Sequence, residues 1–165
     1  MKRVSLAATI IAAILILGAS AWAVSPPTIV FLGAGDVDLG NLNEGPAGAV
    51  CDFPVGGVLH VTSGAKEIQF AGQGVGFAAR DAGALRFTVT NLDTGASLTV
   101  NISGPGWIGS DGFPAIGTGP WLIFEPIDQG GIRYLIGRME FVPAPYGVHA
   151  SLLAGTERNL CDAVA

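Results

Sequence analysis

The sequence predicts an all-β protein: an antiparallel β-sandwich of seven or eight short strands, with a β-barrel as the alternative. Short runs of β-branched and aromatic residues are separated by turn residues, and only the C-terminus of the expected mature chain shows a helical pattern. Glycine makes up 25 of the 165 residues and follows no period, which is typical of tight turns between strands. Half of the residues are hydrophobic, so the chain can bury a core.

The first 23 residues predict a cleavable export signal. A basic start at residues 1–3 precedes an apolar stretch over 4–17, and Ala21-Trp22-Ala23 supplies the small side chains that signal peptidase requires. The apolar stretch is shorter than the roughly 20 residues that span a bilayer. We therefore expect cleavage before Val24, no membrane span in the mature chain and a secreted, extracellular location.

The two cysteines, Cys51 and Cys161, both belong to the expected mature chain. In an oxidising compartment such a pair usually forms a disulfide, and neither has a C-x-x-C partner that would suggest a metal or redox site. We expect a disulfide that ties an early segment to the C-terminus. The expected organisation is a signal over 1–23, an N-terminal strand and Gly/Asp/Asn-rich loop over 24–48, and a disulfide-closed β domain over 49–165.

The expected strands follow the apolar runs of the mature chain. They cover residues 28–32, 50–55, 58–62, 66–70, 85–92, 97–102, 121–124 and 132–142. The clearest pair is the hairpin around Asp93-Thr94-Gly95, because both of its strands alternate polar and apolar residues. We expect a bend at Gly137, and one or two helical turns after Thr156 as the N-cap.

Charge argues against polyanionic partners at the level of sequence. Without Lys2 and Arg3, the mature chain keeps six basic and 13 acidic residues, a net charge of −7. The basic residues are scattered along the chain at Lys66, Arg80, Arg86, Arg133, Arg138 and Arg158. Nucleic acids and anionic membranes are bound by clustered cations, so we expect neither as a partner.

Several short runs carry a resemblance. The runs Thr90-Asn91-Leu92-Asp93-Thr94-Gly95 and Val100-Asn101-Ile102-Ser103-Gly104-Pro105-Gly106, with Cys51-Asp52-Phe53-Pro54 and Asn159-Leu160-Cys161, resemble a group of small exported proteins of actinobacteria. The resemblance covers roughly residues 51–165 and leaves out 33–48. It implies a bacterial, secreted β-sandwich with one disulfide, and it implies no activity.

An acidic segment suggests calcium as a possible ligand. Calcium takes six to eight oxygen ligands, which alternating acidic and amide residues of one loop can supply. The candidate ligands are Asp36, Asp38, Asn41, Asn43 and Glu44. Gly40 breaks the order of an EF-hand loop, and a solvated acidic loop is the alternative. We expect no other cofactor.

Two tryptophans are candidate ligand-binding residues. Trp107 and Trp121 each follow a Gly-Pro turn, and exposed aromatic rings beside strands can stack on sugar rings. The alternative is that both fill the core of the sandwich, where large aromatics are most often found.

No catalytic residue is assigned from the sequence. His60 and His149 are the two histidines, and the chain contains no G-x-S-x-G nucleophile motif. A glycosidase needs only two suitably spaced carboxylates, which sequence does not reveal. The available ones are Glu67, Asp81, Asp111, Glu125 and Glu140.

The expected function is that of a non-enzymatic extracellular domain that binds an unknown ligand or associates with the cell envelope. Two alternatives remain open. One is a secreted hydrolase that uses carboxylates, and the other is a protein inhibitor that presents a rigid loop such as 103–120.

Overall fold

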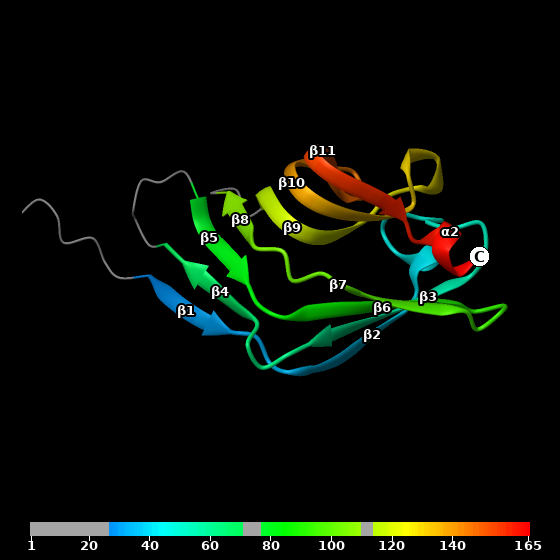
Figure 1. Cartoon of the computed structure of the whole chain (residues 1–165), viewed down its shortest axis with the longest axis horizontal. Coiled ribbons are helices and arrows are strands. Elements are labelled where there is room, and N and C mark those ends of the chain that lie inside the picture. Colours follow the sequence, from blue (N-terminus) through cyan, green and yellow to red (C-terminus); the bar gives the residue numbers. More distant parts are fainter. Residues whose placement is uncertain (1–26, 71–76, 110–113) are drawn as a thin grey trace, which may run out of the picture.

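The computed structural model describes residues 27–70, 77–109 and 114–165. The predicted export signal therefore lies outside the described residues. Two antiparallel sheets, not closed into a barrel, confirm the predicted β-sandwich (Figure 1). The described residues form eleven strands rather than seven or eight, because long glycine-rich stretches also pair.

The larger sheet has seven strands in the order β1-β4-β5-β8-β9-β10-β11. Their bounds are β1 Thr28–Phe31, β4 Lys66–Gln69, β5 Phe77–Ala82, β8 Gly106–Gly109, β9 Pro114–Phe124, β10 Ile132–Ala144 and β11 Gly147–Asn159. The smaller sheet has four strands in the order β2-β3-β6-β7. Their bounds are β2 Gly35–Asn41, β3 Val55–Val61, β6 Leu85–Asn91 and β7 Ser97–Asn101. Two 3-10 turns, Leu42–Glu44 and Ile127–Gln129, and the C-terminal helical turn α2, Cys161–Val164, complete the fold.

The first core fills the space between the sheets. Phe87 and Val89 of β6 and Ile132 of β10 are buried there, together with Leu160 and Val164 at the C-terminus. The predicted hairpin is confirmed, since β6 pairs with β7 and turns its alternating apolar residues inward. The predicted disulfide is confirmed as well. Cys51 and Cys161 are bonded with their Cα atoms 5.6 Å apart, and both lie in this core.

A second core occupies the opposite face of β9, β10 and β11. Its buried members are Ile123, Leu135, Met139, Phe141 and Ala150. The three strands curl around this core, so that β9 approaches β11 although β10 lies between them in the sheet.

Glycine permits this curl at one paired position. Gly137 of β10 lies opposite Gly155 of β11, and both have positive φ angles, 147° and 137°. A Cβ atom on either residue would collide with a backbone carbonyl oxygen of the other strand. The bend predicted at Gly137 therefore depends on a second glycine that the sequence analysis did not single out.

Only the left part of the larger sheet extends beyond the sandwich. Figure 1 shows β1, β4, β5 and β8 at one end of the molecule, with α2 and the C-terminus at the other. The end near α2 contains the disulfide and the first core. The extended end is therefore the part of the molecule where the strands of the larger sheet reach past those of the smaller one.

Three expectations about local structure are wrong. The segment 33–48 is not one long loop, because 35–41 forms β2 against β3. The segment 50–55 is not a strand, since β3 begins only at Val55. Thr156 does not cap a helix, because β11 continues to Asn159 in register with β10 and α2 begins at Cys161.

The disulfide gives a first testable prediction. Its cysteines are 110 positions apart, and closing a loop of that length is expected to stabilise the fold by about 4–5 kcal/mol in the chain-entropy model. We expect the double variant Cys51→Ala/Cys161→Ala to lose about that much free energy of unfolding in urea titrations. The wild type in reductant should behave in the same way, and a loss below about 1 kcal/mol would contradict the prediction.

Candidate functional site

The two candidate tryptophans point to opposite faces of the larger sheet. Trp107 of β8 lies opposite Ile116 of β9, so these two side chains share a face. Trp121 is an odd number of residues further along β9, and alternate side chains of a strand point to opposite faces. The structure therefore does not join the two rings into one platform for a sugar chain.

Trp121 is a packing residue. Its ring lies 5.0 Å from the ring of Phe141, measured between centroids, beside the second core. Gly104, Gly106 and Gly117 let the backbone approach the indole, since a Cβ atom at any of them would clash with it. The indole Nε1 is buried and has no hydrogen-bond partner. These contacts fit the core alternative for Trp121.

Trp107 belongs to a different setting, a half-buried cluster on the open face. Phe70 stacks on its ring with centroids 5.8 Å apart and planes inclined by 21°. The guanidinium carbon of Arg80 lies 5.1 Å from the ring centroid, which is a cation–π contact. The cluster thus combines aromatic rings with a positive charge.

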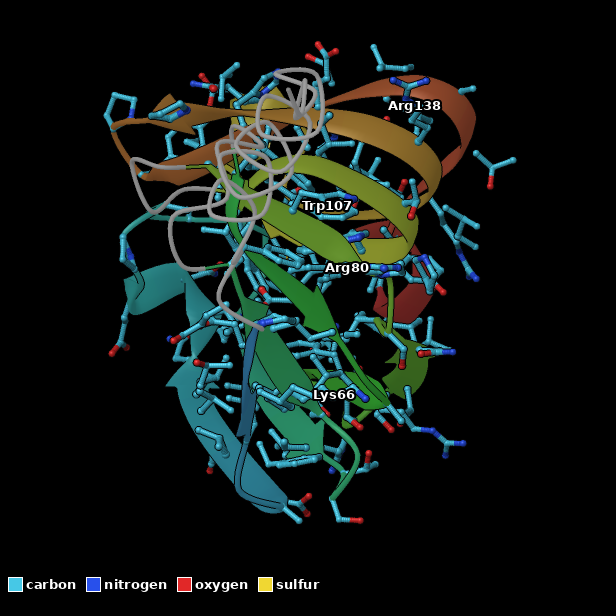
Figure 2. All side chains as sticks on the ribbon, turned by 90° about the vertical axis from the view of Figure 1, so that its left-hand side faces the viewer. Lys66, Arg80, Trp107 and Arg138 are labelled. Carbon is cyan, nitrogen blue, oxygen red and sulfur yellow. A yellow bond between two sulfur atoms is a disulfide. The ribbon has the colours of Figure 1, made fainter. Side chains whose placement is uncertain are left out.

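Two further cations share the face of Trp107. Arg80 lies directly opposite Trp107, and Lys66 is a diagonal neighbour of Arg80 because Ile68 is its direct partner. Arg138 of β10 lies opposite Thr118 of β9, which is on the same face as Ile116. Figure 2 shows Lys66, Arg80, Trp107 and Arg138 in this order from the bottom to the top of the view, with Arg138 on the ribbon of β10. We call these four residues and Phe70 the basic-aromatic face.

Strand alternation sorts the charges of the larger sheet. Lys66 and Glu67 are consecutive in β4, and Arg80 and Asp81 are consecutive in β5, so each cation and its neighbouring anion point to opposite faces. Arg158 follows the same rule after Glu157. The exceptions are Glu140, which shares the face of Arg138, and Arg133, which is buried on the other face.

Arg80 retains unused donor capacity. Its Nε is buried and has no hydrogen-bond partner. A buried donor without a partner is costly, and each such group in a native structure calls for an explanation. The atom is enclosed in the cluster around the Trp107 ring.

The side chains predicted as calcium ligands make other contacts in the structure. Asp36 pairs with His60 at 2.8 Å, and the Asp38 carboxylate accepts the backbone N–H of Gly40 at 2.9 Å. The Asn43 amide donates to the carbonyls of Cys51 and Phe53 and accepts the N–H groups of Val50 and Cys51. Asn41 donates to Glu44.

These contacts tie the segment 41–53 together. Within the described parts of the chain, no group of three or more His, Cys, Asp or Glu residues could hold a metal ion. Asn43 is therefore a structural residue that holds the disulfide loop.

Two of the candidate carboxylates meet at a cavity on the other face of the sheet. Glu67 lies opposite Asp81, and both line a cavity of about 340 Å³ together with Ser103 and Trp121. Burial, and secondly the charge of Glu67, raise the pKa of Asp81. Gln69 donates a hydrogen bond to Glu67 at 2.7 Å. The pair therefore includes one carboxyl group, that of Asp81, that holds its proton to higher pH.

Glu125 is part of a buried structural network. It has no exposed surface, and its Oε1 lies 3.1 Å from Arg133 Nη1 and 2.8 Å from His149 Nδ1. Arg133 also bonds Glu157 through Nε at 2.7 Å, and this hydrogen bond lowers the pKa of Glu157. A buried charge needs such partners. Asp111 lies outside the described residues, and Glu140 is exposed on the face of Arg138.

His60 joins an acid and a hydroxyl in the order of a catalytic triad. Its Nδ1 lies 2.8 Å from Asp36 Oδ1, and its Nε2 lies 2.8 Å from Thr88 Oγ1. Thr88 belongs to β6, which is paired on both sides by β3 and β7. Its neighbouring backbone N–H groups are therefore used in the sheet, which leaves no donors for an oxyanion hole. We assign Asp36, His60 and Thr88 as a polar network that links β2, β3 and β6.

Comparison with protein-family models, curated proteins and solved structures found no match for this chain. In the described part of the chain, no helix has the length and apolar character needed to cross a membrane.

The sequence analysis missed how the cations gather. Lys66, Arg80 and Arg138 are scattered in sequence, yet four strand pairings bring them to one face. The sequence held one signal for this gathering. In each of the pairs Lys66-Glu67 and Arg80-Asp81 a cation precedes an anion, so a strand would place the two charges on opposite faces. The loop expected over 103–120 is also wrong, because 106–109 and 114–120 belong to β8 and β9.

The carboxylate pair predicts a pH-dependent stability. A carboxyl group whose pKa is raised by folding contributes stability at low pH that is lost as the pH rises through its folded-state pKa. We expect Asp81→Asn to raise the melting temperature at neutral pH and to have little effect below about pH 3, where the wild-type group is protonated in both states. Asp93→Asn, at the exposed hairpin turn, is the control. Equal effects of the two substitutions would contradict the prediction.

Proposed function

We propose that the protein is exported and works outside the cytoplasm as a non-enzymatic binding domain for an acidic polysaccharide. Residues 1–23 carry the three regions of an export signal, and the disulfide fits an oxidising compartment. The resemblance of residues 51–165 to small exported actinobacterial proteins supports the same compartment.

The basic-aromatic face is the observation that indicates the chemical class of the ligand. The mature chain has a net charge of −7, yet Lys66, Arg80 and Arg138 lie on one face beside Trp107. Arginine binds carboxylates through paired hydrogen bonds, and aromatic rings pack against the apolar faces of sugars. The Arg80 guanidinium over the Trp107 ring places such N–H donors beside an aromatic surface.

The spacing of the cations favours a polymer of moderate charge density. Lys66 and Arg80 are diagonal neighbours, about 7–8 Å apart at their Cα atoms. Arg80 and Arg138 are three strand spacings apart and displaced by two residues along the strand, which together give about 16 Å. Double-stranded DNA carries one charge per about 1.7 Å and needs a denser cluster of cations. A chain of sugars that carries one carboxylate per ring or fewer matches these distances better.

Export can be tested by expressing the protein in a bacterium and sequencing the N-terminus of the protein recovered from the culture medium. We expect N-terminal sequencing to begin at Val24, because Ala21 and Ala23 supply the small residues that the peptidase recognises. Recovery only from the cytoplasm, or with residues 1–23 retained, would contradict export.

Ligand binding is tested by calorimetry with polygalacturonate, with its neutral methyl ester as the matched ligand. We expect binding of the acidic polymer only. Arg80→Ala and Arg138→Ala should each weaken it about tenfold, since each removes a charge-assisted hydrogen bond. Arg86→Ala is the control, because Arg86 is exposed on β6 of the smaller sheet and should change affinity less than twofold.

The same incubation separates binding from catalysis. Paired carboxylates at a cavity are the requirement of a glycosidase, so hydrolysis is the second candidate function. Release of reducing ends that is lost in Glu67→Gln would establish the hydrolase. Binding without release supports the first proposal, and equal affinity for the acidic and neutral polymers would overturn it.

A further inference from the structure

The four edge strands of the sandwich differ in how they are protected. Exposed sheet edges expose unpaired backbone groups, and proteins block them with charges, bulges or polar residues. The edges here are β1 and β11 of the larger sheet and β2 and β7 of the smaller one. Each is therefore a possible place for another strand to pair.

Three of these edges carry protective features. β2 has Asp36 and Asp38 and an irregular register before Gly40. β11 has Glu157 and Arg158 and an irregular register opposite Arg138/Met139. β7 exposes its polar residues and turns its apolar ones toward the first core.

β1, which has four residues, carries no charge and no irregular register. Four consecutive apolar residues are exposed on both faces of the strand and its extension: Ile29 at 50%, Val30 at 41%, Phe31 at 67% and Leu32 at 46%. Its pairing with β4 is regular. The sequence has no charged residue between Arg3 and Asp36. An edge that is flat, uncharged and apolar is suited to pairing with another strand.

We infer that β1 pairs with β1 of a second copy of this chain, antiparallel across a two-fold axis. The rest of the mature chain is acidic, so two copies repel each other over most of their surfaces. β1 and β7 are the two edges without a charged residue, and of these β1 is the one with exposed apolar side chains on both faces. An antiparallel contact between identical edges closes at two copies and leaves no free β1.

The geometry of this pairing has a consequence for the proposed ligand. The two-fold axis of an antiparallel edge-to-edge pair is perpendicular to the sheet, so the same face of both copies points to the same side. The two basic-aromatic faces would then lie side by side on one continuous sheet. This consequence rests on the proposed function, whereas the pairing itself does not.

The exposed apolar area sets the expected strength. Four side chains of this size at about half exposure offer on the order of 300–400 Å² per copy, below the roughly 800 Å² per partner of a standard stable interface. We therefore expect a reversible dimer with a dissociation constant in the micromolar range or weaker.

The test is sedimentation velocity of the purified protein over a concentration series that reaches the millimolar range. The wild type is expected to shift from monomer to dimer as the concentration rises. Phe31→Lys is expected to remain monomeric, because it places a like charge on both copies at the shared edge. Leu153→Lys is the matched control, since Leu153 is 49% exposed on β11, the opposite edge of the same sheet.

Two outcomes would overturn the inference. One is a wild type that stays monomeric throughout the series, and the other is a dimer that Leu153→Lys abolishes and Phe31→Lys preserves. Circular dichroism melts of both variants check that each is folded. A dimer that does not bind polygalacturonate would support the pairing while contradicting the proposed function, so the two failures are distinguishable.

Discussion

The joining of Cys51 to Cys161 is the constraint on which the domain depends. The disulfide lies in the first core and links the segment before β3 to the helical turn that ends the chain. Asn43 ties the same segment to the 3-10 turn after β2, and the side chain of buried Asn91 binds the carbonyl of Val164. The end of the sandwich near α2 is therefore held by a covalent bond, by apolar burial and by satisfied amides together. A substitution at any of these residues is expected to lower the stability of the whole domain.

The end of the molecule opposite α2 is the one where we propose contacts with other molecules. β1, β4, β5 and β8 reach past the strands of the smaller sheet (Figure 1). The edge of β1 lies there, and so does the basic-aromatic face except for Arg138 of β10. The buried Glu125–Arg133 network lies instead in the curled part of the sheet, where its charges satisfy one another. The charges of Glu125, Arg133 and Glu157 thus stabilise the fold, whereas the cations of the basic-aromatic face are the charges that we assign to a ligand.

Sequence reasoning predicted the sandwich, the disulfide and the hairpin because each has a local or pairwise signal. Alternation in 85–92 and 97–102 determines which side chains face the core, and two cysteines allow only one pairing. It failed for β2 and β11, where glycines interrupt the apolar pattern and neighbouring strands supply the pairing. It also failed to separate the two tryptophans. A Gly-Pro turn precedes each of them, and only the strand register shows that Trp107 lies on the open face and Trp121 beside the second core.

The sequence by itself determined the all-β class, the covalent link and the acidic net charge, because these depend on composition and on short-range periodicity. The tertiary structure decided which charges are neighbours. Lys66, Arg80 and Arg138 meet because non-consecutive strands pair in a particular order and register, and a shift of one residue would move each of them to the opposite face. Strand order and register arise from the packing of the whole chain, so no local pattern contains them.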